Sequence, residues 1–183
     1  MKIRIYKSYG FTLVELIITI AIMAIILTIA YPYIMTLLAN MEAKRIRHEI
    51  VNTLKLAKAE SYIQRQNVMA CLSDSNRHCD KDSNNALLLF FDKNNNQKFD
   101  SDVDILIEEQ RLRPKYGSLH LRAGQRHYVR FAGDSGNPRG FFGHIKYCPR
   151  SIYSQAMYQI SFNQAGIIKY KPDSKSQPTE CSA

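Results

Sequence analysis

Residues 10–39 read GFTLVELIITIAIMAIILTIAYPYIMTLLA and contain a single charged side chain, Glu15. About 20 apolar residues cross a bilayer as an α-helix, so this stretch is long enough to do so. The residues before it include three basic and no acidic side chains: Lys2, Arg4 and Lys7. Positive charge ahead of an apolar segment keeps that end of the chain in the cytoplasm. The stretch therefore predicts a membrane helix that places the rest of the chain on the opposite side.

Glu15 does not fit a plain membrane anchor. An ionised carboxylate deep in a membrane helix costs about 2.5 to 3.5 kcal/mol on insertion scales. No basic side chain follows it before Lys44, which is too far along a helix to reach back. The carboxylate is therefore expected to have a partner in another molecule.

The stretch SYGFTLVEL (residues 8–16) resembles the processing motif of type IV prepilins. In that motif a basic leader ends in glycine, phenylalanine follows, and glutamate lies four residues beyond the phenylalanine. The resemblance implies that a prepilin peptidase cuts after Gly10 and that the new amino group of Phe11 is methylated. Glu15 then pairs with the Phe11 amine of a neighbouring subunit, which relieves the cost of both buried charges and favours assembly. Pro32, which removes a helical hydrogen bond, matches a proline in pilin stems.

The helical pattern continues beyond the membrane segment. Residues 41–67 contain no glycine or proline, and apolar side chains recur there at spacings of three and four: Ile46, Ile50, Leu54 and Ala57. This spacing predicts an amphipathic helix with one buried stripe, ending between Val68 and Cys71. We therefore expect four parts: a leader at 1–10, a transmembrane helix at 11–39, its amphipathic continuation at 40–71 and a globular β-rich head at 72–183.

The head contains short apolar or alternating runs separated by polar turns. Seven segments are predicted to be strands: Ala86–Phe91, Asp104–Glu109, Leu119–Arg122, His127–Phe131, Phe142–Cys148, Tyr158–Phe162 and Gly166–Lys171. Their spacing indicates one antiparallel sheet or two small sheets. The predicted fold class is α+β, with a long N-terminal helix packed on a C-terminal antiparallel β-sheet domain, a pilin-like arrangement.

The cysteines indicate the redox environment. There are four of them, an even number, in a part of the chain expected outside the cytoplasm, which favours disulfides. Of three pairings we favour Cys71–Cys79, a short loop, and Cys148–Cys181, which would hold the C-terminal tail. Zinc is the alternative, but no pair has the two-residue spacing of a zinc knuckle. No cofactor and no metal is predicted.

Residues 92–104 read DKNNNQKFDSDVD and are a candidate calcium-binding loop. Four side chains have the spacing of calcium-loop ligands: Asp92, Asn94, Asn96 and Asp100. However, Gln97 stands where an EF-hand has glycine, and Val103 replaces the closing glutamate. The favoured interpretation is a polar hairpin loop whose Asx side chains bond to the backbone, with calcium as the alternative.

Catalysis has little support in the sequence. There is no P-loop and no glycine fingerprint before a helix. The pairs Ser118–His120 and Ser73–Asp74 are not signatures of a catalytic triad. No catalytic residue is therefore assigned, and the chain is not expected to be an enzyme.

Four further segments resemble the FimT/GspH family, the minor pilins of type IV pili and minor pseudopilins of type II secretion systems. They are residues 71–82, 89–107, 130–148 and 160–170. The resemblance implies a single-pass protein of the inner membrane with a periplasmic head. After processing, it joins other minor and major pilins or pseudopilins in the tip or initiation complex of a pilus or pseudopilus.

DNA is the alternative partner that the resemblance suggests. Some FimT-like pilins bind DNA during natural transformation through a C-terminal Gly-Arg-x-Arg motif. Residues 166–171 read GIIKYK here and lack both arginines. Lys169 and Lys171 are two residues apart and would share one face of a strand, but lysine lacks the bidentate fork of arginine. Three arginines would extend such a patch: Arg126, Arg130 and Arg139. The net charge of +9 falls to +6 without the leader, 22 basic against 16 acidic residues, which supports an attraction to polyanions only weakly. Assembly is therefore the favoured role.

Overall fold

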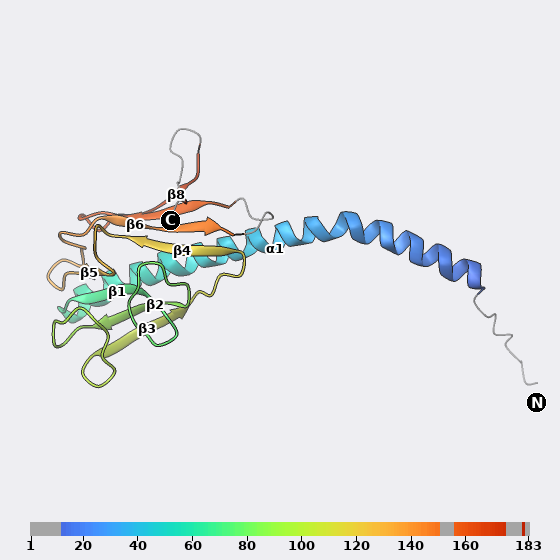
Figure 1. Ribbon diagram of the computed structural model, residues 1–183. Coiled ribbons are helices and arrows are strands. Elements are labelled where there is room, and N and C mark those ends of the chain that lie inside the picture. The colour runs from blue at the N-terminus through green and yellow to red at the C-terminus, as the bar shows by residue number, and fades with distance from the viewer. Residues whose placement is uncertain (1–11, 151–155, 175–180, 182–183) are drawn as a thin grey trace, which may run out of the picture. The chain divides into compact units, whose positions relative to one another are not determined.

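The computed structural model describes residues 12–150, 156–174 and 181. The chain divides into two compact units, one ending at Leu37 and one beginning at Leu38. The described residues form one helix and eight strands, labelled in Figure 1. They are α1 (Leu13–Gln64), β1 (Val68–Ser73), β2 (Ala86–Phe91), β3 (Ile105–Arg111), β4 (Gly117–Arg122), β5 (Val129–Phe131), β6 (Gly143–Pro149), β7 (Tyr158–Phe162) and β8 (Ile168–Pro172).

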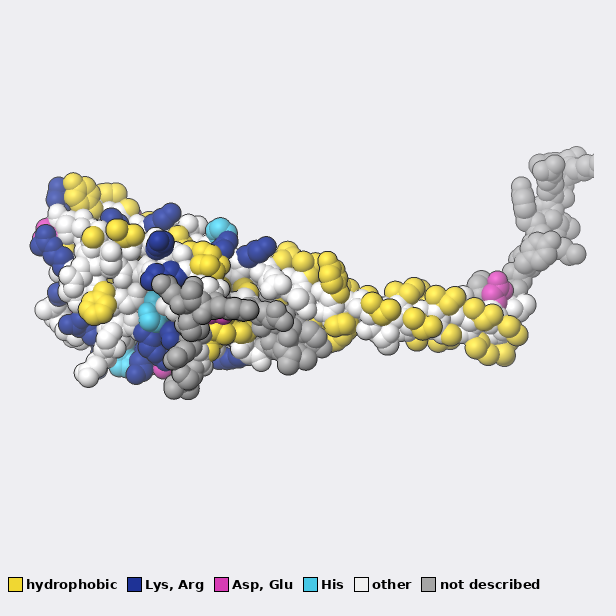
Figure 2. All heavy atoms as spheres, turned by 90° about the horizontal axis from the view of Figure 1, so that it is seen from above, with side chains coloured by type: hydrophobic (Ala, Val, Ile, Leu, Met, Phe, Trp, Pro, Cys, Tyr) yellow, Lys and Arg dark blue, Asp and Glu magenta, His cyan; other side chains and the backbone are white. Residues whose placement is uncertain are grey.

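The first unit consists of the N-terminal part of α1, which is covered by apolar side chains (Figure 2). An 18-residue window of the helix has a mean hydropathy of 2.8, so it is long and apolar enough to cross a membrane. The hydroxyls of Thr19, Thr28 and Thr36 donate hydrogen bonds to carbonyls one turn earlier in the helix. These bonds satisfy the threonine hydroxyls inside the helix itself, which lowers their cost in an apolar environment.

The second unit contains the rest of α1 and all eight strands. The predicted apolar stripe is buried, with Ile46, Ile50, Leu54 and Ala57 all at 0% exposure. In Figure 1 this part of the helix lies between the strands β4, β6 and β8 on one side and β1, β2 and β3 on the other. One core cluster contains side chains of the helix and of both groups of strands. The helix is therefore the layer on which the head is built.

The strands form two antiparallel sheets of four. The first sheet has the order β3-β2-β1-β5 and the second has the order β4-β6-β7-β8. In the second sheet apolar residues alternate with polar ones, and the apolar ones enter the common core. This arrangement confirms the α+β class, and of the two arrangements expected from the sequence it is the one with two small sheets. Two segments that are close in sequence, β4 and β5, lie in different sheets.

The helix ends earlier than the sequence analysis predicted. It ends at Gln64 and not between Val68 and Cys71, so the helical part of segment 40–71 is too long by several residues. Arg65 has a φ of 54°, a left-handed conformation that terminates the helix. Residues Val68–Ser73 form β1, which lies inside its sheet and is buried on both faces. A strand of this kind is a continuous apolar run, which periodicity cannot distinguish from the end of a buried helix.

Both disulfides have the pairing that the sequence analysis favoured. Cys71 on β1 is joined to Cys79 in the following loop, with a Cα–Cα distance of 5.5 Å. Cys148 on β6 is joined to Cys181, with a Cα–Cα distance of 5.7 Å. The first disulfide fixes a short loop to the first sheet, and the second ties the C-terminal region to the second sheet.

Polar contacts also hold α1 on the second sheet. The carboxylate of Glu42 accepts hydrogen bonds from the backbone N–H groups of Lys115 (2.8 Å) and Tyr116 (2.9 Å). The hydroxyl of Tyr158 donates to the backbone carbonyl of Ala43 at 2.9 Å. A side chain at Gly117 would run into the ring of Tyr147, which packs against it. The start of β4 is therefore fixed to the helix by one carboxylate and requires glycine.

We expect replacement of Cys148 and Cys181 by serine to destabilise the head more than replacement of Cys71 and Cys79. The two disulfides span 33 and 8 residues, for which chain-entropy estimates give about 3.7 and about 2.5 kcal/mol. Chemical denaturation of the full chain in detergent, without reductant, would measure the difference. An equal or larger loss of the free energy of unfolding for the short loop would contradict the prediction.

Candidate functional site

The start of α1 lies in the region that the sequence analysis identified as a processing site. Thr12 caps the helix: its side-chain oxygen accepts a hydrogen bond from the backbone N–H of Glu15 at 3.2 Å. Thr12 and Glu15 thus have the spacing of a capping box, a feature the sequence analysis overlooked although the T-x-x-E pattern signals it. In the part of the chain that the structure describes, no side chain pairs with the Glu15 carboxylate. Gly10 and Phe11 lie outside the described residues, so cleavage and methylation stay predictions.

A basic face covers the outer side of the second sheet. The strand register aligns two cross-strand rows there, Arg122–His144–Ser161–Lys169 and His120–Lys146–Gln159–Lys171. Figure 2 views the molecule from the side of β6 and β8 and shows lysine, arginine and histidine side chains grouped on the head. We call the basic members of these rows the outer basic face: Arg122, His144, Lys146, Lys169 and Lys171, with His120 at its edge.

The members of this face differ in whether their charge is already paired. Lys169 and Lys171 lie on the same face of β8, as the period of a strand predicts, and neither has a side-chain partner among the described residues. Arg122 is paired with Asp82 at 2.7 Å. The two β8 lysines are therefore the charges that remain available to an anionic partner.

The three arginines expected to extend the patch are not part of this face. Arg130 lies on β5 in the first sheet, with its guanidinium over the ring of Phe141. Arg126 also lies over that ring, at 4.4 Å from the centroid. Arg139 forms an ion pair with Asp134 at 2.6 Å. The expectation that they extend the lysine patch is therefore wrong, because all three lie outside the cross-strand rows of the second sheet.

His144 lies in the middle of the outer basic face and is neutral at physiological pH. Its Nε2 atom is buried without a hydrogen-bond partner among the described residues. Burial, together with the positive charges of Lys146, Arg122 and Lys171, lowers the pKa of His144 to about 4. The imidazole therefore contributes no charge to the face until the solution is strongly acidic.

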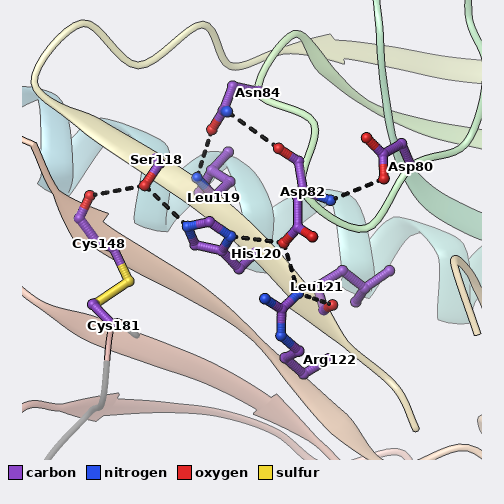
Figure 3. A network of polar contacts seen from close by, with 10 residues as sticks. All are labelled: Asp80, Asp82, Asn84, Ser118, Leu119, His120, Leu121, Arg122, Cys148 and Cys181. Carbon is purple, nitrogen blue, oxygen red and sulfur yellow. Dashed lines mark hydrogen bonds and ion pairs between the residues drawn. A yellow bond between two sulfur atoms is a disulfide. The ribbon is translucent and has the colours of Figure 1, made fainter. Parts of the chain in front are cut away.

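A polar network closes the free edge of β4, as Figure 3 shows. Asp82, in the loop between β1 and β2, accepts hydrogen bonds from His120 Nδ1 and Arg122 Nη1, both at 2.7 Å. In the same loop Asn84 and Lys81 accept hydrogen bonds from backbone N–H groups of β4. Burial acts to raise the pKa of Asp82, but the hydrogen bonds from His120 and Arg122 outweigh it and hold the pKa below its usual value. The loop of the first sheet thus covers an edge of the second.

This network contains three residues in the order of a serine hydrolase triad. Ser118 Oγ lies 3.0 Å from His120 Nε2, and His120 Nδ1 lies 2.7 Å from Asp82. However, Ser118 is only 7% exposed and its hydroxyl also contacts the backbone carbonyl of Cys148 at 3.4 Å. Asp82 also accepts a hydrogen bond from Arg122, so its carboxylate does not pair with the histidine alone. A hydroxyl buried to this degree does not meet a substrate, so we assign the network a structural role.

The loop at residues 92–104 joins β2 and β3, which pair antiparallel as the hairpin interpretation predicted. The carboxylate of Asp92 accepts hydrogen bonds from the backbone of Asn96 and Gln97, and that of Asp104 from Lys93 and Asp100. Among the residues that the structure describes, no group of three or more His, Cys, Asp or Glu could hold a metal ion. The Asx side chains are therefore engaged in shaping the loop, which favours the hairpin over the calcium alternative.

Comparison with known proteins adds a finding at the N-terminal end. Residues 5–31 match the family model of the prokaryotic N-terminal methylation motif. This is the prepilin signal of type IV pilin-like proteins, and with an apolar helix on an antiparallel β domain it supports the class of pilins and pseudopilins. The motif implies membrane anchoring, processing by prepilin peptidase and assembly with other pilins. No curated protein and no solved structure matches the chain significantly.

We expect His144 to make the free energy of unfolding of the head depend on pH. Its pKa is lowered from 6.5 to about 4, so between these values the unfolded chain binds a proton that the folded head does not. The free energy of unfolding should therefore fall as the pH is lowered from 6.5 to about 4, and His144→Gln should remove much of this loss. Denaturant titrations at several pH values would test this, with the exposed His48→Gln as control. Equal pH profiles for the His144 variant and the unmodified protein would contradict it.

Proposed function

We propose that this protein is a minor pilin or pseudopilin of the FimT/GspH type that acts in the tip or initiation complex of a filament. The match of residues 5–31 to the N-terminal methylation motif carries the proposal. The long apolar helix supports it, since this part of the chain can lie in the inner membrane as a single span. The basic leader places the head in the periplasm before the subunit enters a pilus or pseudopilus.

In this proposal the chemistry of assembly lies at the first turn of α1. Removal of residues 1–10 creates a methylated amino group on Phe11, a cation next to an apolar segment. Glu15 supplies an anion four residues later, and its carboxylate has no side-chain partner in the described part of its own chain. Pairing with the Phe11 amine of a neighbouring subunit neutralises both charges. Because an unpaired buried charge is costly, the pair favours a single axial register between neighbours.

The processing step predicts a specific mature mass. Intact-mass measurement of the exported protein should show the loss of residues 1–10 and the gain of one methyl group. Gly10→Val should block this change, because a β-branched side chain obstructs the close fit that a peptidase needs at the cleaved bond. Ala59→Val, at an exposed position of α1, is the control. A mature protein that keeps residues 1–10 would overturn the proposal.

The role of Glu15 can be separated from helix capping. Both Glu15→Ala and Glu15→Gln remove the charge, but glutamine retains the side chain that a capping box accepts. If the ion pair with Phe11 drives assembly, both variants should lose most filament formation or secretion while remaining processed and membrane-bound. Filament counts or secretion assays in cells would measure this. Normal assembly by Glu15→Gln would rule out the ion pair.

A second candidate function, DNA reception at the filament tip, is supported by the outer basic face. Its two cross-strand rows place Lys146 on β6 and Lys169 and Lys171 on β8, with β7 between them and Arg122 at one end. Such a surface suits phosphate contacts, which supply most of the affinity of sequence-independent DNA binding. Lysine gives point charges without bidentate geometry, so the expected binding is weak and insensitive to sequence. For this reason we rank it below assembly.

The DNA-binding candidate predicts a strong dependence on salt. Double-stranded DNA should bind the purified full chain, and Lys169→Ala with Lys171→Ala should weaken it and lower the slope of log K against log salt by about two units. Lys44→Ala with Lys55→Ala, a pair of exposed lysines on α1, is the matched control. Fluorescence anisotropy at several salt concentrations would measure both. Absence of binding near physiological salt would eliminate this function.

A further inference from the structure

A cavity of about 410 Å³ lies on the head, apart from the outer basic face. It is lined by parts of three loops: residues 78–79, residues 96–100 and residues 127–128. They surround the small core cluster on the other side of the first sheet, to which Cys79, Phe99 and Tyr128 contribute. The volume is in the range of small-molecule sites in proteins, about 300 to 1,000 Å³.

The apolar lining of the cavity is held in place by aromatic packing. The ring of Phe99 packs edge-on against Phe90, with centroids 5.3 Å apart. The ring of Tyr128 packs against Phe141, with centroids 5.6 Å apart. Both Phe99 and Tyr128 are half-buried, so each also presents part of its surface to the cavity. These fixed rings offer a ligand an apolar surface at a low cost in side-chain entropy.

Unused hydrogen-bonding groups line the same cavity. The side chains of Gln97, Lys98, His127 and Tyr128 have no hydrogen-bond or ion-pair partner among the described residues. Between them they offer an amide, an ammonium, an imidazole and a phenol. The opposite holds for Asp100, whose carboxylate accepts hydrogen bonds from the side chains of Asn94 and Asn96. The free groups are thus those that a ligand in the cavity would meet.

Two of the three loops that line the cavity are fixed before any ligand binds. The Cys71–Cys79 disulfide holds one of them to β1. In the second, the Asp92 carboxylate accepts a hydrogen bond from the backbone N–H of Gln97 at 2.9 Å. Gln97 has a φ of 65°, a left-handed conformation that is uncommon for a residue other than glycine. A site whose loops are already ordered loses less entropy on binding than a flexible one.

The chemistry of the lining selects the class of ligand. Lys98 and Asp100 place one positive and one negative charge at the cavity, so neither a strongly anionic nor a cationic ligand is favoured. The remaining free groups donate and accept neutral hydrogen bonds beside two aromatic rings. A pyranose ring combines hydroxyl groups around its edge with apolar C–H faces, and so matches both parts of the lining. We propose that this cavity binds a pyranose unit of a polysaccharide, a function that does not depend on the proposed role in assembly.

The experiment uses the purified full chain in a polyoxyethylene detergent, because sugar-based detergents would compete. Chitotriose, cellotriose and trigalacturonate serve as probes for acetylated, neutral and acidic sugars, and saturation-transfer NMR and calorimetry measure binding. At least one trisaccharide should bind. Gln97→Gly with His127→Ala should weaken this binding about tenfold, the effect of losing hydrogen bonds at two positions. Glycine adopts the left-handed conformation of position 97 without strain, so the loop should be preserved.

Matched controls and a second variant keep the test decisive. Gln64→Ala with His48→Ala, two exposed side chains of the same types on α1, should leave binding within twofold. Lys98→Ala, an exposed position of the lining, should weaken binding independently of the loop at residue 97. AMP, measured in the same way, tests whether the aromatic rings of the cavity bind a nucleobase instead of a sugar. Failure of all three trisaccharides to bind, binding unchanged in the cavity variants, or preference of the cavity for AMP would each overturn the proposal.

Discussion

The head depends on the burial of one stripe of α1 between two sheets. Each sheet has an apolar face, and neither could keep that face from water without the helix. Ile46, Ile50 and Leu54 are fully buried in the core cluster that includes both sheets. Burying a side chain of this kind stabilises the folded state by about 1.5 to 3 kcal/mol, so the stripe outweighs any single polar contact. The hydrogen bonds of Glu42 and Tyr158 then fix the position of the helix on the second sheet.

The position of this core determines where function can lie. Because strands alternate, turning the apolar residues of the second sheet toward the helix turns Lys146, Lys169 and Lys171 outward. On the first sheet, the face away from the helix carries a small apolar cluster that loops must cover. Those loops form the cavity. The basic face and the cavity are therefore both consequences of packing two sheets on one helix, on surfaces that the core leaves free.

Patterns local in sequence predicted most of the fold, and contacts distant in sequence other than the Cys148–Cys181 disulfide escaped prediction. The helical stripe, the hairpin of β2 and β3 and the shared face of Lys169 and Lys171 follow from spacing alone. Strand β1 was missed because a strand buried on both faces lacks alternation. The contact of Asp82 with His120 joins residues 38 apart and depends on how the two sheets meet. The cavity was not predicted either, because three loops that are distant in sequence line it.

The first turn of α1 is compatible with the role in assembly that we propose for Glu15. The backbone N–H of Glu15 is bonded to Thr12, and this bond leaves the carboxylate free. The threonine hydroxyls farther along the stem are bonded within the helix, and Glu15 is the only charged residue from Thr12 to Ala39. Dispersion between apolar helices changes little when one slides along another, whereas an ion pair between chains exists at one register. In the proposed filament, the stem's apolar length therefore anchors the subunit and its one carboxylate sets the axial position.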